Sequence, residues 1–187
     1  MFNTISHLGY LDGNSSRILD VFSGAGSVGL EALSRGASFA TFVDFSRECI
    51  ETSCRNALKC KFQHQISSIC SKAEDVFANP PKYEHYLHAP YQIVTMTPPY
   101  REVSYPLLMD TLCASSLIEP DSLIVVEYPL EMGTMPFFWG KQQEWIGLRN
   151  RRYGRTVIAM YVNRPTMTFD FREDEFRTEA ITPKKPY

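Results

Sequence analysis

The sequence lacks the features that mark membrane and secreted proteins. Its longest apolar runs are far too short to cross a bilayer. Met1–Tyr10 has neither the charged start nor the apolar core of a signal peptide, nor the Arg- and Ser-rich character of a transit sequence. We therefore expect an intracellular protein, either cytoplasmic or located in a plastid or mitochondrion if a transit peptide is missing from this chain.

Metal-binding patterns are also missing. The cysteines are odd in number and form no C-x-x-C pair, so we expect reduced thiols and no metal site. His85 and His88 stand in a Pro- and Tyr-rich stretch without the acidic motif of a metalloprotease, which favours a surface loop. The five cysteines are Cys49, Cys54, Cys60, Cys70 and Cys113.

Neither charge sign dominates. Nineteen Lys and Arg residues against 21 Asp and Glu residues give a formal net charge of −2, which by itself does not indicate nucleic-acid binding. What the 187 residues do contain is an ordinary globular composition, 44% hydrophobic and 21% charged. This length and composition predict one soluble domain with a substantial core.

A glycine-rich turn between a strand and a helix is the strongest local signal in the chain. Ile18–Phe22 is a short apolar run with one acid and predicts a buried strand. Gly24 and Gly26 then let the backbone turn tightly and approach a ligand closely. A helical pattern begins at Ser27, a suitable cap, and stops near Gly36. Together these features predict a nucleotide-binding site.

Strands and helices alternate along most of the chain. Further strands are expected at Phe39–Asp44, Ile66–Cys70, Gln92–Met96 and Ser122–Glu127, with helices at about Ser46–Leu58 and Pro106–Ala114. Glu144–Arg151 and Thr156–Val162 instead predict a hairpin. We expect an α/β domain over residues 1–163, with a mostly parallel sheet and a C-terminal antiparallel hairpin. Residues 164–187, with few large aliphatic side chains, predict a disordered tail.

A proline pair follows the fourth expected strand, in Thr97-Pro98-Pro99-Tyr100. Two prolines in series stiffen the loop and remove amide donors, so the preceding carbonyls can point at a ligand. Tyr100 offers a flat face on which a base can stack. Taken alone, these residues are better explained as a turn after a strand. Combined with the glycine turn upstream, they favour a substrate site.

The residues around the glycines indicate which nucleotide binds. In dinucleotide sites the first glycine lies close against the strand, so that the helix dipole meets a pyrophosphate. Here Asp20 stands inside the strand, and Phe22 and Ser23 separate it from Gly24 and Gly26. This arrangement resembles the first motif of S-adenosylmethionine-dependent methyltransferases. The proline loop resembles the Asp/Asn-Pro-Pro-Tyr/Phe motif of enzymes that methylate planar nitrogen, with a threonine in first place.

With both motifs placed, the chain is similar to the bacterial-type small-subunit ribosomal RNA guanine-N2 methyltransferases, most closely to their plant and algal relatives. The similarity runs from about residue 2 to residue 162. That family has a basic segment before the first strand, ending in a Phe-Asn-like pair, and this chain begins within it at Met1-Phe2-Asn3. Either the gene prediction is truncated or this copy has lost the segment. The matching stretches are Leu19–Gly36, Phe42–Asp44, Thr97–Tyr100, Val126–Pro129 and Arg152–Thr156.

The resemblance implies S-adenosyl-L-methionine as the cofactor and no metal. It implies that the backbone around Phe22–Gly26 faces the methionine part, that Asp44 accepts from the ribose hydroxyls, and that Ala73 borders the adenine. The implied cofactor residues are Asp20, Phe22, Ser23, Gly24, Gly26, Asp44 and Ala73. The implied catalytic residues, which hold the target base, are Thr97, Pro98, Pro99 and Tyr100.

Four arginines fall within seven residues around the expected hairpin turn: Arg149, Arg151, Arg152 and Arg155. A solvated hairpin and a phosphate-binding surface explain them about equally well, because the cluster would lie next to a base-binding cleft. The resemblance implies small-subunit ribosomal RNA or an assembling ribosomal subunit as the partner of a monomeric protein.

These observations lead to one expected function and three alternatives. We expect methyl transfer to the N2 amine of a guanine in small-subunit ribosomal RNA, with the base unpaired or flipped out. Methylation of an adenine amine or a glutamine amide is the nearest alternative, because both reactions use a similar loop. A cofactor-binding relative without activity, acting in ribosome assembly, is supported by Thr97 and the short N-terminus. A nicotinamide oxidoreductase is disfavoured by Asp20 and the Pro-Pro-Tyr loop.

Overall fold

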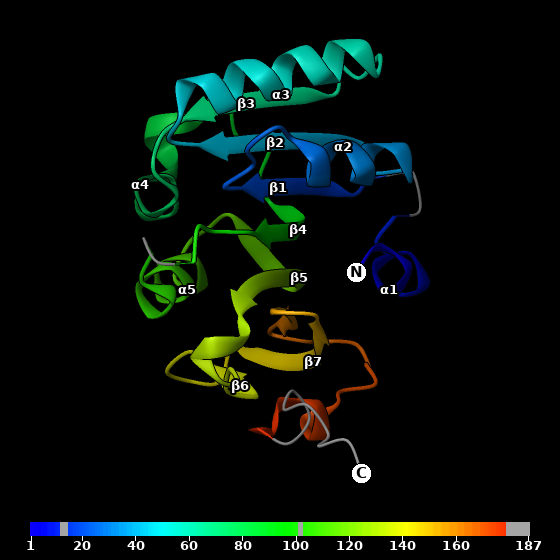
Figure 1. Ribbon diagram of the computed structural model, residues 1–187, viewed down its shortest axis with the longest axis vertical. Coiled ribbons are helices and arrows are strands. Elements are labelled where there is room, and N and C mark those ends of the chain that lie inside the picture. Colours follow the sequence, from blue (N-terminus) through cyan, green and yellow to red (C-terminus); the bar gives the residue numbers. More distant parts are fainter. Residues whose placement is uncertain (12–14, 101–102, 179–187) are drawn as a thin grey trace.

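The computed structural model describes residues 1–11, 15–100 and 103–178, built around one eight-stranded sheet (Figure 1). The strand order is β3-β2-β1-β4-β5-β8-β7-β6, from the top to the bottom of Figure 1. The strands are β1 (Arg17–Val21), β2 (Phe39–Asp44), β3 (Ile66–Cys70), β4 (Tyr91–Met96), β5 (Ile118–Pro129), β6 (Phe138–Trp139), β7 (Trp145–Tyr153) and β8 (Thr156–Asn163). The described helices are α1 (Phe2–His7), α2 (Ser27–Ser34), α3 (Arg47–Lys59), α4 (Ala73–Ala78), α5 (Tyr105–Cys113) and the short 3-10 turns η1 (Pro80–Tyr83), η2 (Leu130–Met132) and η3 (Glu173–Phe176).

Strands β1 to β5 pair in parallel, and β8, β7 and β6 extend the sheet in antiparallel fashion. This topology confirms the predicted α/β class with a mostly parallel sheet and a C-terminal antiparallel hairpin. The carboxyl ends of parallel strands lie at the same edge of a sheet, so the loops that follow β1, β2, β3 and β4 meet there. That edge carries the residues that the sequence assigned to the cofactor and to the target base.

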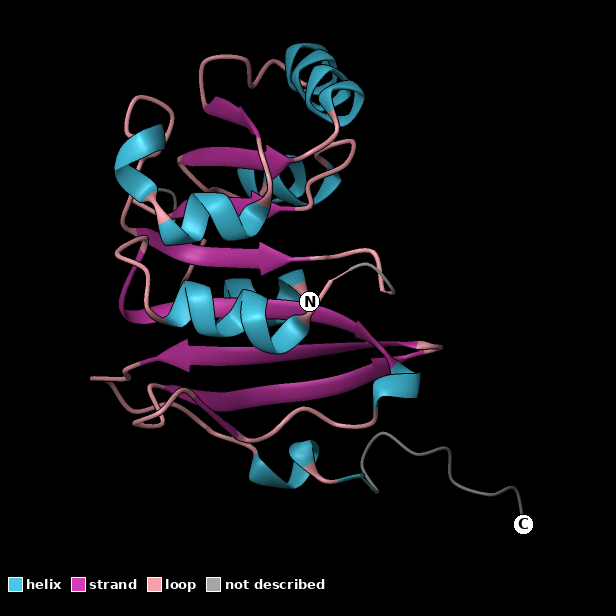
Figure 2. Cartoon of the chain, turned by 90° about the vertical axis from the view of Figure 1, so that its left-hand side faces the viewer, coloured by secondary structure: helices cyan, strands magenta, loops and turns pink. Residues whose placement is uncertain are grey.

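Helices cover both faces of the sheet (Figure 2) and divide its side chains between two apolar cores. Leu19 and Val21 of β1 point into the core covered by α4 and α5. Ile18 points into the opposite core, which α1 and α2 cover. Because apolar side chains are buried on both faces, the central strands have near-continuous hydrophobic sequences, as expected for a parallel sheet.

The start of α2 differs from the prediction that Ser27 caps this helix. Gly26 occupies the cap position with a φ of 79°, and Ser27 is the first helical residue. An acceptor for the first turn of the helix comes from another element, since Asp20 Oδ2 accepts from the buried N–H of Gly29 at 2.9 Å. Helix α3 follows the prediction: Ser46 caps it, and its hydroxyl accepts from the N–H of Cys49 at 3.4 Å.

Several short elements were not predicted. Helix α1 buries Ile5 completely against the second core, although its sequence is mostly polar. Strand β5 begins at Ile118 rather than at Ser122, because its pairing with β4 continues across a register shift. Asp121, with a φ of 66°, lies within that irregular segment. Six residues of α4 and two of β6 are too few to give a period in the sequence.

Part of the tail predicted to be disordered, residues 164–178, is described, whereas 179–187 lie outside the described residues. Phe176 in η3 is 6% exposed, and its ring lies 5.4 Å from the Tyr161 ring and 5.5 Å from the Phe137 ring. In this segment, which has few large aliphatic side chains, an aromatic side chain therefore provides the apolar surface that is buried. The domain boundary at residue 163 stays a prediction. Among the described residues, no helix has the length and apolar character needed to span a bilayer.

Candidate active site

Two adjoining cavities open at the carboxyl edge of the parallel strands. The first has a volume of about 210 Å³ and the second about 430 Å³. Both are lined by Phe22, Asp44, Phe45 and Pro99, so a ligand in one would touch the walls of the other. Within the described ranges, no group of three His, Cys, Asp or Glu side chains is arranged to hold a metal ion.

The loop after β1 is held in a fixed, unusual conformation at the border of both cavities. Phe22 has a φ of 60°, a left-handed conformation that few non-glycine residues adopt. The N–H of Ser23 donates to the carbonyl of Val43 at 3.1 Å, and the N–H of Gly26 donates to the carbonyl of Ser23 at 2.7 Å. Backbone strain of this kind clusters at ligand sites. Here the strained backbone directs the Phe22 carbonyl to the hydroxyl of Thr97, which lines the second cavity.

Asp20 supports this loop from behind and does not line either cavity. Its side chain is completely buried, and its two oxygens accept from the Gly29 N–H and the Thr95 hydroxyl, each at 2.9 Å. Burial raises the pKa of Asp20 from 3.8 to about 7, against the lowering effect of those two hydrogen bonds. In the structure Asp20 therefore holds the loop in position from beneath, and its expected part in cofactor binding stays a prediction.

Gly29 explains why α2 can approach β1 and β2 so closely. A Cβ atom at this position would lie 2.5 Å from the Cε1 atom of Phe42 and 3.3 Å from Oδ2 of Asp20. Gly26 is similarly enclosed, since a Cβ there would meet that of Ser53 at 2.9 Å. Two of the three glycines in the motif are therefore required by packing, and Gly24, whose φ is 51°, by backbone conformation.

Asp44, at the end of β2, faces both cavities. It is 8% exposed, and its two oxygens accept from the backbone N–H groups of Gly24 and Ser46, each at 2.9 Å. These bonds fix the carboxylate and tie the glycine loop to the start of α3. Because an ionised carboxylate has about four acceptor positions, it can accept further hydrogen bonds from ligand hydroxyls.

The remaining wall of the first cavity comes from the loop between β3 and α4. Ala73, the first residue of α4, is 2% exposed at the base of this wall. Phe45 forms the outer rim and is 62% exposed, which is unusual for a phenylalanine beside an apolar cavity. The other lining residues are Val43, Ser71, Lys72, Glu74, Pro99 and Val103. A flat, largely apolar group with a few polar edges fits these walls.

The proline loop forms the floor of the second cavity. The Thr97 N–H donates to the carbonyl of Val21 at 3.3 Å, which attaches the loop to β1. The Thr97 hydroxyl donates to the carbonyl of Phe22, also at 3.3 Å. Since that bond uses the only hydrogen of the hydroxyl, the oxygen can act toward a ligand only as an acceptor.

Tyr100 is anchored by two residues to which the sequence gave no individual role. Its hydroxyl donates to Glu127 Oε1 at 2.7 Å and lies 2.8 Å from Thr156 Oγ1. Burial raises the pKa of Tyr100, and Glu127 raises it further, so the phenol stays protonated. Glu127 and Thr156 both lie in stretches that carried the family resemblance. Their positions, near a strand end and a hairpin turn, were the only signal in the sequence that could have identified them as site residues.

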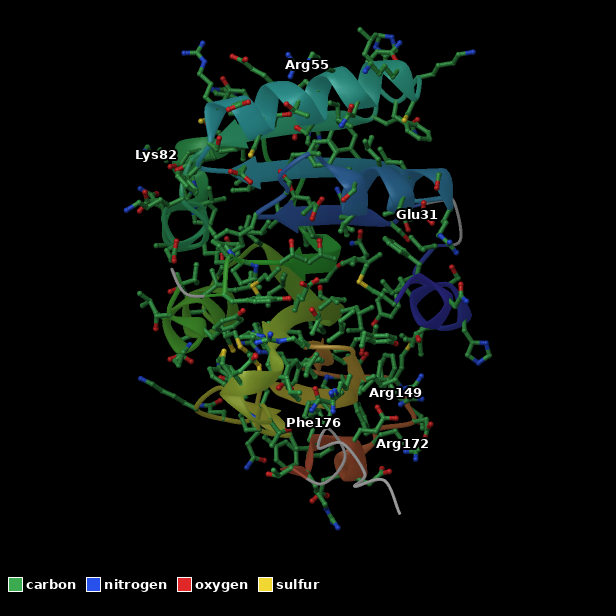
Figure 3. The ribbon with its side chains drawn as sticks, in the orientation of Figure 1. Glu31, Arg55, Lys82, Arg149, Arg172 and Phe176 are labelled. Carbon is green, nitrogen blue, oxygen red and sulfur yellow. The ribbon has the colours of Figure 1, made fainter. Side chains whose placement is uncertain are left out.

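The four arginines do not line either cavity. In the described part of the chain Arg149 pairs with Asp170 at 2.9 Å and Arg151 with Glu175 at 3.3 Å, while Arg155 pairs with Glu131. Figure 3 places Arg149 at the end of the molecule opposite α3. Arg155 lies closer to the site, because the next residue in the chain contacts Tyr100.

The sheet order and the site at its carboxyl edge together define the fold of S-adenosylmethionine-dependent methyltransferases. A solved structure of a provisionally named methyltransferase from Escherichia coli, yhhF, superposes with a TM-score of 0.71 and 26% identity. The superposition covers 87% of this chain and 82% of that one.

The chain belongs to the family described as conserved hypothetical protein 95, whose model matches residues 1–162. It is 30% identical over 164 residues to YlbH of Bacillus subtilis, provisionally named an rRNA methyltransferase, covering 88% of this chain and 83% of that protein. It is 26% identical over 152 residues to ribosomal RNA small subunit methyltransferase D of Haemophilus influenzae, covering 80% of this chain and 73% of that protein. These relatives confirm the resemblance at the level of the family.

Proposed function

We propose that this chain binds S-adenosylmethionine and transfers a methyl group to the N2 amine of a guanine in small-subunit ribosomal RNA. The observation that carries the proposal is the Thr97 hydroxyl, oriented by the Phe22 carbonyl, at the border of a cavity walled by Asp44. The names of the relatives support a ribosomal RNA substrate. The assignment of the N2 amine as the methylated atom is more specific, and it rests on the residues of the proline loop.

The first cavity fits the cofactor. Asp44 can accept from a ribose diol, since its carboxylate is fixed by two backbone amides at one edge of the cavity. Phe45, Ala73 and Val103 provide apolar walls for a purine ring. The strained Phe22 backbone and the glycines after it allow the polar part of a ligand to approach the main chain closely. When bound, S-adenosylmethionine supplies an electrophilic methyl group on a sulfonium centre.

The proline loop can orient a planar amine. An exocyclic amine is a poor nucleophile because its lone pair is delocalised into the ring. The Thr97 oxygen can accept one amine hydrogen, and the Pro98 carbonyl is the candidate acceptor for the other. Holding both hydrogens fixes the direction of the lone pair, and fixed orientation can account for a large part of a rate enhancement. No side-chain base is needed, because the methylated amine loses its proton readily to water.

The target base would stack on Tyr100, which is 38% exposed and held in place through its hydroxyl. A base inside an RNA helix cannot reach this ring, so the substrate nucleotide must be unpaired or flipped out. This requirement suits RNA recognition, in which unstacked bases are commonly read by aromatic side chains.

The test is methyl transfer by purified protein, using labelled S-adenosylmethionine with small-subunit ribosomal RNA or assembling subunits. Thr97→Val should lower the rate by roughly 10- to 1,000-fold, because one oriented hydrogen bond is lost. Thr97→Ser keeps the hydroxyl and should retain most of the activity. Calorimetry on all variants should show unchanged cofactor affinity. Mass spectrometry of the product nucleosides should show N2-methylguanosine.

Two results would overturn this proposal. If neither wild type nor Thr97→Asp transfers a methyl group while both still bind the cofactor, the chain is an inactive cofactor-binding relative. If the methyl group is found on an adenine amine or on a glutamine amide of a ribosomal protein, the enzyme class holds but the guanine assignment fails.

A further inference from the structure

We infer that Glu127 selects guanine by accepting a hydrogen bond from the ring N1–H beside the target amine. This inference rests on the proposed function and adds to it the residue that distinguishes guanine from other planar nitrogen substrates. Glu127 is a carboxylate in the wall of the second cavity, together with Thr97, Pro98 and Tyr100. Its side chain is thus in the same cavity as the groups proposed to hold the amine.

The sheet register places Glu127 beside Thr97. Strands β4 and β5 are parallel, and their last paired residues are Met96 and Val126. Thr97 directly follows β4, and continuing this register by one residue would bring it beside Glu127, at a strand spacing of roughly 4.8 Å. Side chains at matching positions on adjacent strands point to the same face, so the hydroxyl and the carboxylate are neighbours. Two adjacent acceptors therefore face the second cavity.

The hydrogen-bonding edge of guanine presents donors in the same arrangement. The N1–H lies directly beside the N2 amine, so a guanine with its amine at Thr97 would direct N1–H toward the next strand. The carboxylate of Glu127 can accept this hydrogen, because the Tyr100 hydroxyl uses only one of its acceptor positions. Enzymes that act on a flipped base read it through such contacts to its Watson–Crick edge.

The alternative substrates present an acceptor where guanine has a donor. Adenine has an unprotonated ring nitrogen beside its amine, and a glutamine amide has a carbonyl oxygen beside its amine. Either acceptor would face the carboxylate of Glu127 without a hydrogen between them. Two acceptors without a hydrogen between them repel, and a site built to accept from a ligand N–H disfavours an analogue that lacks that hydrogen. Glu127 therefore favours guanine over both alternatives.

A simpler role for Glu127 is to hold Tyr100 in place, and a matched pair of variants separates the two. Glu127→Gln keeps an oxygen that can accept from Tyr100 but puts an amide donor in place of the other oxygen. Tyr100→Phe removes the hydrogen bond to Glu127 but leaves the carboxylate and the stacking ring. If Glu127 only anchors Tyr100, both variants should change the reaction rates of different bases by the same factor.

The probe is 2-aminopurine, which keeps the N2 amine but has an unprotonated ring nitrogen in place of N1–H. Small-subunit RNA carrying guanine or 2-aminopurine at the modified position is compared in the methyl-transfer assay. Wild type should prefer guanine, and Glu127→Gln should reduce the ratio of kcat/KM values for the two bases by about 10- to 100-fold. Tyr100→Phe should slow both reactions and leave the ratio unchanged.

A binding measurement keeps the inference falsifiable in a chain that does not turn over. The affinities of guanosine monophosphate and 2-aminopurine riboside monophosphate are compared by NMR in the presence of the demethylated cofactor. Glu127→Gln should reduce the ratio of the affinities for guanosine monophosphate and 2-aminopurine riboside monophosphate. An unchanged ratio in both assays refutes the role of Glu127, even if wild type is fully active. Loss of methyl transfer with a preserved, Glu127-dependent guanine preference refutes only the proposed function.

Discussion

Replacing Asp20 by Asn should stabilise the protein at neutral pH and leave cofactor binding unchanged. Asp20 is completely buried between the Gly29 N–H and the Thr95 hydroxyl. Asn has the same shape, its oxygen can accept from Gly29, and its amide can donate to the oxygen of Thr95 after the hydroxyl rotates. The substitution therefore keeps both contacts and removes a buried negative charge.

The size of the effect follows from the pKa of Asp20, which burial raises from 3.8 to about 7. Between these values the folded protein keeps a proton that the unfolded chain releases, so stability falls as the pH rises through this window. A difference of about three pKa units corresponds to a ceiling of about 4 kcal/mol, reached above pH 7. The Asn variant cannot ionise and should lack this part of the pH dependence.

The assay is urea unfolding of both proteins at pH 5, 6, 7 and 8. The free energy of unfolding of Asp20→Asn minus that of wild type should grow with pH over this range. Glu84→Gln, at a side chain that is 71% exposed, is the control and should show no such trend. A difference that stays constant with pH would refute the reasoning. Weakened S-adenosylmethionine binding by Asp20→Asn would favour direct cofactor contact instead.

Three further variants test other parts of the site. Asp44→Ala should weaken S-adenosylmethionine binding in calorimetry by about 1–3 kcal/mol, because ribose hydroxyls would lose a charged acceptor; tight NAD binding instead would contradict the site. Gly29→Ala should lower the free energy of unfolding by about 1–3 kcal/mol in urea, since its Cβ would meet a fully buried phenylalanine ring; an unchanged value would contradict the packing. The double change Arg152→Ala and Arg155→Ala should weaken binding of all RNA sequences and flatten its salt dependence. Arg149→Ala is the control, and an equal effect there would argue against a local phosphate contact.

The fold could largely be predicted because its main elements carry repeating local signals. The alternation of apolar strands with helical segments indicated a parallel sheet, and the change of pattern after residue 144 indicated the hairpin. Helices of six residues, such as α1 and α4, span fewer than two turns and give no such period. The burial of Phe176 was not predicted, because it depends on contacts with a distant strand that composition does not reveal.

The site was only partly predictable, because a motif gives residue types but not the direction of a side chain. Asp20 stands within β1 and Asp44 ends the neighbouring strand β2, and the family resemblance placed both acids at the cofactor. The structure points one into the core and the other toward the cavities. Glu127 shows the opposite case, since its importance depends on the register between β4 and β5, which no local pattern encodes.

The arginine cluster shows how the fold changes the meaning of a charge pattern. In the sequence its four members are equivalent, but the structure separates them along the hairpin. Arg149, whose side chain is 15% exposed, is held by Asp170 of the C-terminal segment. Arg155 stands at the turn, beside the residue that contacts Tyr100, and its side chain is 86% exposed. An exposed ion pair contributes little stability, so a phosphate can compete for Arg155 at small cost. RNA contact should therefore concentrate at the turn, next to the second cavity.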